Sequence, residues 1–401
     1  MTEKTHVVIV GGGYAGTLAA NRLRQRPDLD ITLVNPRPVF VERIRLHQLV
    51  ADTGAATADY GSLLGEGIQL VIDAVERIDA GARRLLLTSG TALHYDYLIY
   101  AVGSAGAVPS TLGAAEFAHS VADLESAQRL RYALADLPRS APVTVVGGGL
   151  TGIETASELA EQGRPVTLVC GGTLGKSLSK RGRRSVAKQL RQLDVNILES
   201  VLEPIRVSEV RWDSVVLSDG AVLPSAATVW TAGFAVPDLA ARSGLGTDEV
   251  GRLLTDETLT SIGDDRIVAA GDAAAPSGQP LRMSCQAAEP LGAQAANTVL
   301  ARIAGTAPAL LNQAFTGQCI SLGRARATLQ FARTDDTPVN MALGGRTTAA
   351  IKETICKATM WAIRHEAAKP GSYLWLKGGS RPPQPAEQPA EQPTDQQVAI
   401  Q

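Results

Sequence analysis

The sequence has few cysteines, and they are not arranged for the chemistry that cysteine pairs perform. The four, Cys170, Cys285, Cys319 and Cys356, lie far apart and form no CxxC or CxxxxC pair. This spacing excludes a disulfide framework, a zinc site and a redox-active dithiol. We therefore expect no metal centre and no dithiol chemistry.

An excess of charge of one sign is also missing. The 38 basic and 40 acidic residues give a net charge of −2, which provides no field to attract nucleic acid. No apolar run reaches the roughly 18 residues of a membrane span. The first residues, MTEKTHVVIV, lead directly into a strand without a signal-peptide pattern. These features indicate a cytoplasmic protein, and 401 residues suit two or three domains.

What the sequence does contain is a repeated glycine pattern. Residues 7–23, VVIVGGGYAGTLAANRL, are nearly repeated at 143–159, VTVVGGGLTGIETASEL. In the first copy Gly11 permits a tight turn, Gly13 lets the backbone approach a pyrophosphate, and Gly16 allows close packing of helix on strand. Unpaired N–H groups and the macrodipole at the helix N-terminus then favour the anion. The strand and helix around the GxGxxG pattern make dinucleotide binding the favoured interpretation.

The second copy has the same parts. Gly147, Gly149 and Gly152 follow an apolar strand, a helix extends to about Gln162, and a further strand covers 165–169. The repeat predicts two dinucleotide sites in one chain. A chain that binds two dinucleotides is expected to move electrons between them.

Each of these units departs from the pattern at the end of its second strand. An Asp or Glu there normally accepts hydrogen bonds from the adenosine ribose, but this chain has Asn35 and Cys170. Basic residues follow Cys170: Lys176, Lys180, Arg181, Arg183 and Arg184. They could bind the 2′-phosphate of NADPH or form an ordinary solvated helix face, so the choice between NADH and NADPH stays open.

Three further stretches extend the pattern: YDYLIYAVGS at 95–104, ATVWTAGF at 227–234 and GRLLTDETLTSIGDDRIVAAGDAAA at 251–275. In order and spacing they resemble the flavoproteins with two dinucleotide-binding domains of the pyridine-nucleotide oxidoreductase superfamily. Within it, the chain is most similar to type II NADH dehydrogenases and their apoptosis-inducing-factor-like relatives. The resemblance covers roughly residues 5 to 330.

The resemblance implies an α/β fold with two Rossmann-like dinucleotide-binding domains, the NAD(P)H domain inserted into the FAD domain, plus a small C-terminal region. The expected parts are 1–112 and 252–330 for the FAD domain, 113–251 for the NAD(P)H domain, 331–378 for the C-terminal region with an amphipathic helix, and 379–401 for a tail. The tail is rich in Pro, Gln and Glu and is expected to be disordered.

The resemblance also implies which residues bind the cofactors. For FAD they are Gly11, Gly13, Tyr14, Ala15, Gly16, Asn35, Arg43, Ala101, Val102, Gly103, Gly271, Asp272 and Ala273. For NADH or NADPH they are Gly147, Gly149, Gly152 and Gly233. Asp272 matches the acid that hydrogen-bonds the ribityl chain, although an ordinary helix N-cap is the alternative. Glu154 matches an acid near the nicotinamide and the flavin.

The segment VFVERIRLHQLVA, 39–51, occupies the place where disulfide reductases of the superfamily carry their cysteine pair. Here it holds Glu42, Arg43, Arg45, His47 and Gln48, so electrons must pass from the flavin to an external acceptor. Arg45 and His47, with Glu154, are the predicted catalytic residues, which could stabilise a reduced flavin or protonate an acceptor. The alternative is an amphipathic helix with salt-bridged arginines. Tyr14 could pack near the flavin or fill the seam between the domains.

The sequence favours a quinone as the acceptor without deciding it. The family motif AQxAxQQG near the quinone site aligns with CQAAEPLG, 285–292, where Pro290-Leu291 replaces the double glutamine. The segment 347–369 spaces its apolar residues on one helical face (Ile351, Ile355, Ala358 and Ala362, with Trp361 beside them) and is locally basic. Such a helix can lie in a membrane interface, pack on its own protein, or meet a second subunit in a homodimer.

We therefore expect an FAD-dependent NAD(P)H:acceptor oxidoreductase. Hydride passes from the nicotinamide C4 to flavin N5, and electrons continue to a quinone-type acceptor. A soluble flavoenzyme that reduces a small metabolite, dioxygen or a protein electron carrier is the alternative, and a redox-sensing nucleotide binder is the third.

Overall fold

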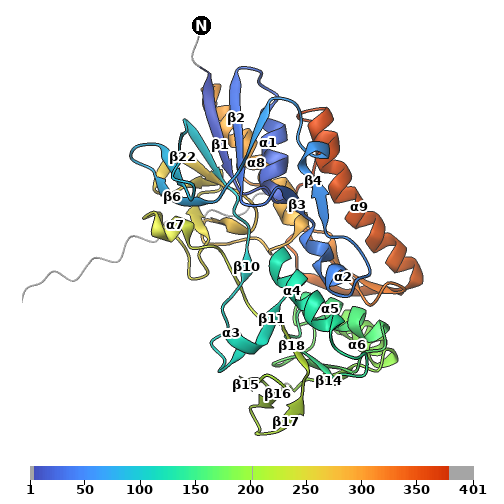
Figure 1. Cartoon of the computed structure of the whole chain (residues 1–401). Coiled ribbons are helices and arrows are strands. Elements are labelled where there is room, and N and C mark those ends of the chain that lie inside the picture. Colours follow the sequence, from blue (N-terminus) through green and yellow to red (C-terminus); the bar gives the residue numbers. More distant parts are fainter. Residues whose placement is uncertain (1–3, 201, 379–401) are drawn as a thin grey trace, which may run out of the picture.

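The computed structural model describes residues 4–200 and 202–378; the predicted disordered tail, 379–401, lies outside this range. Two lobes are visible in Figure 1, one built on β1, β2 and β22 and the other carrying α5, α6 and β18. The helix α9 extends along one side of the first lobe.

The first lobe is organised by an eight-stranded sheet in the order β23-β20-β21-β22-β9-β1-β2-β5. Its strands are β1 Thr5–Val10, β2 Leu29–Asn35, β5 Ile68–Ile72, β9 Tyr97–Tyr100, β20 Leu253–Thr255, β21 Thr260–Ser261, β22 Asp264–Ala269 and β23 Ala274–Pro276. The neighbours from β5 through β2, β1 and β9 to β22 are parallel. Because β1 lies between β2 and β9, the loop after β1 opens at the point where the strand order reverses, which is where such sheets bind ligands.

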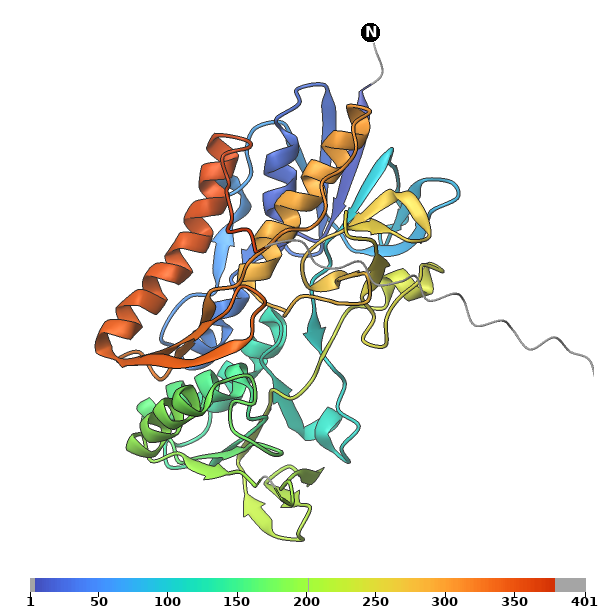
Figure 2. The ribbon, with the colours of Figure 1, turned by 180° about the vertical axis from the view of Figure 1, so that it is seen from behind.

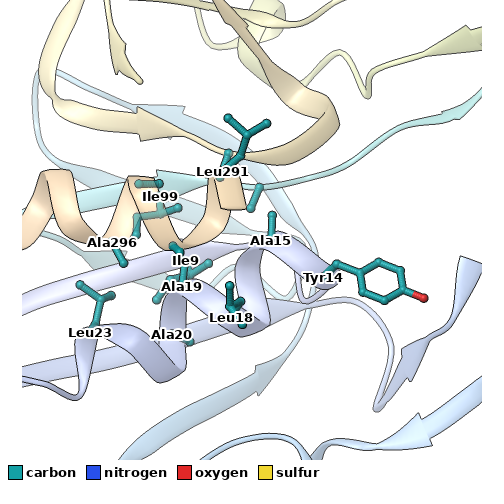
Figure 3. Close-up of a cluster of buried hydrophobic side chains, with 14 of the residues drawn as sticks. Ile9, Tyr14, Ala15, Leu18, Ala19, Ala20, Leu23, Ile99, Leu291 and Ala296 are labelled. Carbon is teal, nitrogen blue, oxygen red and sulfur yellow. The ribbon is translucent and has the colours of Figure 1, made fainter. Parts of the chain in front are cut away.

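Three helices cover one face of this sheet and lie side by side in Figure 2: α1 Tyr14–Leu23, α8 Cys285–Ile303 and α9 Arg346–Ala368. All of α1 is buried, and Figure 3 shows the part of α1 that carries Ala15 and Leu18 alongside the part of α8 that carries Leu291 and Ala296. A Cβ on Gly292 would collide with the Ala15 carbonyl. That glycine therefore sets how closely α8 approaches α1.

The opposite face packs against a small antiparallel sheet of β6 Val75–Asp79, β7 Arg84–Leu87 and β8 Ala92–His94. Its buried Ile78, Leu85 and Leu87 join Val8, Val10 and Leu98 in one apolar cluster. Buried and exposed residues alternate along β7, as expected for a sheet that buries only one face.

The second lobe holds a five-stranded sheet in the order β11-β18-β12-β13-β14, all parallel. Its elements are β11 Ala118–Ser120, α4 Leu124–Ala135, β12 Val143–Val146, α5 Leu150–Glu161, β13 Val166–Val169, α6 Lys180–Gln192, β14 Asn196–Leu198 and β18 Ala227–Trp230. A three-stranded sheet, β15 Val207–Val210, β16 Ser214–Leu217 and β17 Val222–Pro224, precedes β18. The chain thus leaves the first sheet after β9 and returns to it at β20. The predicted α/β class with one Rossmann-like unit inserted into the other is confirmed.

A third sheet, β24 Gly317–Ser321, β25 Ala327–Ala332 and β26 Pro338–Gly345, leads into α9. The predicted limit at residue 330 falls within β25. The residue limits of the domains stay predictions. Short connecting elements complete the described chain: β3 Val39–Val41, α2 Leu46–Val50, β4 Thr57–Asp59, β10 Ala105–Gly106, α3 Ala114–Phe117, β19 Phe234–Ala235 and α7 Leu239–Arg242.

The predicted C-terminal helix is present as α9, but it packs with a different face from the one that the sequence suggested. Cys356, Met360 and Ile363 are buried, and the last two join the core of the first lobe. Ile355 and Trp361, from the predicted apolar face, are exposed. Among the described residues, no helix is both long and apolar enough to cross a membrane.

Candidate functional site

The two glycine loops have the same geometry. The first glycine of each has a positive φ, +104° at Gly11 and +121° at Gly147, which a side chain would rarely adopt. A Cβ on the third glycine, Gly16 or Gly152, would collide with the carbonyl oxygen of the first. The first and third glycines therefore fix the tight turn and the close approach of helix to strand.

The middle glycines differ from their neighbours because they face open space. A Cβ on Gly13 or Gly149 would meet no atom within 4 Å. Both residues are N-caps without a side-chain cap, of α1 and α5 respectively. The helix N–H groups behind them are left to bind an anion in that space, so both loops fit the pyrophosphate of a dinucleotide.

The residues that end the second strands hold the loops in place. The Asn35 Oδ1 accepts a hydrogen bond from Gly12 N at 3.0 Å, and its Nδ2 donates to Arg37 O at 2.8 Å. In the other unit, Cys170 lies so close that a Cβ on Gly148 would be 2.8 Å from its Cβ. Contact of Asn35 with an adenosine ribose stays a prediction.

A carboxylate nevertheless lies beside Cys170. Glu199 follows β14, the neighbour of β13, and its Oε2 accepts a hydrogen bond from Leu174 N at 3.0 Å. Burial, helped by the Glu199 charge, raises the pKa of Cys170 to about 12. Lys176, Lys180, Arg181 and Arg184 are exposed.

A cavity of about 880 Å³ connects the first glycine loop to α9. Several predicted residues line it: Gly13, Tyr14, Ala15, Arg43, His47, Ala101, Gly103, Glu154, Gly271 and Asp272. Three other predicted residues, Arg45, Val102 and Ala273, do not line this cavity. Gly233 borders a separate cavity of about 300 Å³ beside β18.

Asp272 is held by side chains from two other segments. Its Oδ2 accepts hydrogen bonds from Ser104 Oγ at 2.7 Å and from Arg43 Nη1 at 3.2 Å. It lies in a single 3₁₀ turn, Gly271–Ala273, whose N-cap is Ala270. The N-cap alternative is therefore wrong, and β23 and a loop intervene before α8.

Glu154, in the first turns of α5, is buried against α9 and β24. Its Oε1 accepts hydrogen bonds from Lys352 Nζ at 3.1 Å and from Ser321 N at 2.9 Å. Burial pushes the pKa of Glu154 upward, but Lys352, His47 and the Ser321 N–H outweigh it, so the pKa lies below its ordinary value. Glu154 is thus an ionised group in a buried ion pair.

His47 lies between two glutamates of α5. Its Nδ1 is 3.9 Å from Glu154 Oε2, and its Nε2 is 3.9 Å from Glu158 Oε1. Burial lowers the pKa of His47 to about 4 and raises that of Glu158 to about 7. The imidazole is therefore neutral at pH 7, and His47 presents an uncharged ring to the cavity.

Arg45 is tied to neighbouring acids rather than to the cavity. Its guanidinium bonds both carboxylate oxygens of Glu353, at 3.0 and 3.1 Å, and Glu42 at 3.1 Å. The salt-bridge alternative describes this residue, and the geometry gives no support to a catalytic role. The amphipathic helix of that alternative forms only in part, because strand β3 and a 3₁₀ turn, Arg43–Arg45, precede α2.

Sequence reasoning missed four residues on this site: Ser104, Lys352, Glu289 and Tyr373. Ser104 ends the quoted stretch 95–104, where its position after a strand was a usable signal. Lys352 was counted with the basic residues of an amphipathic helix, yet it is largely buried and donates to Glu154 and to Cys319 O. Nothing in the sequence pattern singles out Glu289 or Tyr373.

These features define an oxidoreductase with two dinucleotide cradles in an α/β fold. The sequence model of the pyridine nucleotide-disulphide oxidoreductases matches residues 5–292. The chain belongs to this family, whose members use FAD and NADH, as the resemblance predicted. Cys170, Cys285, Cys319 and Cys356 are free thiols in the structure.

Relatives and solved structures point the same way. An NADH dehydrogenase-like protein of Mycobacterium tuberculosis (strain ATCC 25618 / H37Rv) is 33% identical over 328 residues, which cover 74% of this chain and 80% of the relative. A type II NADH:quinone oxidoreductase of the same strain is 28% identical over 353 residues, covering 77% and 74%. The structure of NDH2 from Plasmodium falciparum in complex with NADH has a TM-score of 0.77 at 16% identity, covering 91% of this chain and 97% of that one. This last likeness concerns the fold.

Proposed function

We propose that the protein is an FAD-dependent NADH:quinone-type oxidoreductase. The observation that carries the proposal is the single cavity that runs from Gly13 and Asp272 to α9. Its outer wall includes Trp361, Leu374 and Leu376, which are 61%, 85% and 63% exposed. An exposed apolar rim is suited to a lipophilic acceptor. The name of the type II NADH:quinone oxidoreductase relative supports the same acceptor class.

When bound, FAD takes two electrons as hydride from the nicotinamide and passes them to the acceptor. The chain's part is binding and orientation. The loop at Gly13 holds the FAD pyrophosphate, and the loop at Gly149 holds that of the nicotinamide nucleotide. Asp272, fixed by Ser104 and Arg43, would hold the ribityl hydroxyls. The Glu154–Lys352 pair lies on the wall of the same cavity.

NADH is the nucleotide that we propose for the second cradle. The Glu199 carboxylate lies at the end of β14 beside Cys170, where the adenosine ribose of the nucleotide would bind. A negative charge there repels the 2′-phosphate of NADPH. The exposed basic residues of α6 form an ordinary solvated face.

Peripheral contact with a membrane through 347–369 fits this proposal, because Ile355 and Trp361 of α9 lie at the exposed rim. An amphipathic surface with Trp binds the interfacial zone of a bilayer. A homodimer through the same face stays the alternative. Sedimentation with vesicles of anionic lipid, compared for the wild type and Trp361→Ala, distinguishes the two.

Steady-state oxidation of NADH and NADPH, with ubiquinone and menaquinone analogues or with oxygen alone, tests the function. We expect quinones to raise the rate well above the oxygen rate and NADH to have the higher kcat/KM. The replacement of the double glutamine by Pro290-Leu291 favours the second candidate, a small soluble acceptor. If quinones add nothing to the oxygen rate, that candidate replaces the first.

A further inference from the structure

One buried carboxyl group on the cavity wall has no role in the function proposed above. Glu289 lies on α8, one turn after Cys285, and its side chain lines the cavity. The residue is only 5% exposed, and its Oε1 has no hydrogen-bond partner. A buried polar atom without a partner costs free energy, which indicates that a ligand group completes it.

The local structure of α8 fixes where Glu289 lies. Ser284 caps the helix by accepting a hydrogen bond from Ala287 N. Pro290 has no N–H for the Gln286 carbonyl, and Gln313 Nε2 donates to that carbonyl instead, at 2.7 Å. The turn that carries Glu289 is therefore held in place despite the proline.

Hydroxyl and thiol groups lie near the carboxyl. Tyr373 interacts with it, Tyr14 and Cys285 line the same cavity and interact with its charge, and the Tyr14 hydroxyl is also buried without a partner. Burial raises the pKa of all three groups and brings that of Cys285 to about 12. None of them carries a charge at neutral pH.

The nearby basic residue is already neutralised. Arg22 Nη1 forms a buried ion pair with Glu366 Oε1 at 3.2 Å. Glu366 also accepts hydrogen bonds from Gly371 N at 2.7 Å and Tyr373 N at 2.6 Å. These contacts fasten the segment 371–376, here called the strap, over the cavity and orient Tyr373.

Without a counter-ion, Glu289 holds its proton. Burial raises its pKa to about 8, and Tyr373 only partly opposes this shift. From α9, His365 lines the same cavity, and Cys356 is buried. At pH 7 Glu289 therefore presents a carboxylic acid, which can donate a hydrogen bond or a proton, in an apolar wall.

We propose that Glu289 is the proton donor to the carbonyl oxygen of a quinone-type acceptor bound between α8, α9 and the strap. Reduction to the quinol takes two electrons and two protons. The hydride of NADH supplies the two electrons and one of the protons, by way of the flavin. The Glu289 O–H bond breaks as an O–H bond forms on the acceptor, which supplies the other proton. After the quinol leaves, the Glu289 carboxylate regains a proton from solvent. This inference rests on the proposed function.

The substitution Glu289→Gln tests the role because the amide keeps the shape and the hydrogen bond but cannot transfer a proton. General acid catalysis contributes roughly 10²–10⁴-fold, so we expect kcat with a water-soluble ubiquinone analogue to fall at least about tenfold at pH 7. Ferricyanide accepts electrons without protons, so its rate should not change. The wild-type quinone rate should decline as pH rises through about 8, and the variant should lose this dependence. Glu257→Gln is the matched control, since Glu257 is buried but does not line the cavity.

Binding provides a second measurement. Trp361 and Trp375 line the cavity, so quenching of their fluorescence by the oxidised quinone analogue reports its Kd in the absence of NADH. We expect Glu289→Gln to keep the Kd within about threefold, and Glu289→Leu to weaken it more. Tyr373→Phe should move the pH midpoint of the quinone rate upward, because Tyr373 lowers the pKa of Glu289.

The outcomes separate the two proposals. A wild type without any quinone-dependent rate contradicts the proposed function, whatever Glu289 does. A full quinone rate and an unchanged pH profile in Glu289→Gln contradict only the proton-donor role. If Glu289→Gln does not fold, Glu289→Asp replaces it, and a shifted pH midpoint in that variant is the expected result.

Discussion

At the scale of single residues, the site depends on charges that are buried in matched pairs. Lys352 Nζ has two partners, Glu154 Oε1 at 3.1 Å and Cys319 O at 2.8 Å. Burial by itself lowers the pKa of Lys352, but Glu154 reverses this and holds it above its ordinary value. Each member of the pair keeps the other ionised.

Lys352→Met should therefore destabilise the protein by leaving Glu154 as an uncompensated buried charge, at a cost of about 3–5 kcal/mol near pH 8. The stabilisation that a depressed carboxyl pKa provides is present above the unfolded value and is lost as pH falls. The loss in the variant should therefore shrink at pH 5, where Glu154 can take up a proton. Urea unfolding at both pH values measures it, and Glu154→Gln/Lys352→Met should recover most of the stability. An equal loss at both pH values would contradict the explanation.

The residues that the sequence predicted and those that it missed differ in the origin of their roles. The roles proposed for Gly13 and Asp272 depend on their place in a local motif, which spacing can show. Those proposed for Lys352 and Glu289 depend on contacts between elements far apart in the chain. Their environment exists only after α8, α9 and β24 have packed, so no local pattern marks them.

At the scale of elements, the two strand–loop–helix units separate two uses of glycine. Gly13 faces open space, whereas Gly16 is packed against the Gly11 carbonyl. The same contrast holds for Gly149 and Gly152. A methyl group added at each position therefore tests either ligand binding or packing.

Gly13→Ala should leave the unfolding midpoint of the FAD-free protein nearly unchanged but weaken FAD binding at least about tenfold, because the methyl group occupies the space for the pyrophosphate. Gly16→Ala should lower the unfolding midpoint, because the added methyl group displaces the backbone at a cost of about 1–3 kcal/mol. Flavin absorbance after dialysis and thermal unfolding measure the two effects. Gly149→Ala serves as the control: it should stay yellow and lose affinity for NADH. Loss of the yellow colour in that variant would refute the assignment of the two cradles.

Helices were predictable from the sequence where a strong hydrophobic period follows a glycine loop. The helix expected after the first glycine loop is α1, and the one expected to extend to about Gln162 is α5. The segment 39–51 was harder to predict, since it breaks into β3, a 3₁₀ turn and α2. Tertiary contacts such as the Arg45–Glu353 pair hold its short pieces in place. The segment has no hydrophobic period of its own from which they could be predicted.

At the scale of the whole molecule, a seam of buried polar groups joins the two lobes and the C-terminal unit. His47 comes from α2, Glu154 and Glu158 from α5, and Lys352 from α9. The His47 Nε2 and Glu158 Oε1 atoms face each other 3.9 Å apart, and both lack a hydrogen-bond partner. The two side chains share one titratable proton. It lies on Glu158 when the imidazole is neutral, and it would lie on His47 in the ionised pair.

This seam predicts a pH dependence of stability in which two opposite contributions nearly cancel. The pKa of His47 is lowered to about 4, so its contribution is present above the unfolded value near 6.5 and is lost as pH falls. The pKa of Glu158 is raised to about 7, so its contribution is lost as pH rises from about 4.5. Between pH 5 and 6.5 the wild type should change little on their account.

Replacing either residue should reveal the pH dependence of stability that the other one contributes. His47→Gln leaves Glu158, so its free energy of unfolding should fall, relative to the wild type, as pH rises from 5 to 6.5. Glu158→Gln leaves His47, so its free energy of unfolding should rise over the same interval, by up to about 1.4 kcal/mol per pH unit. Urea titrations at three pH values, referred to the wild type, measure both slopes. Slopes of the same sign in the two variants would mean that His47 and Glu158 do not share a proton across the seam.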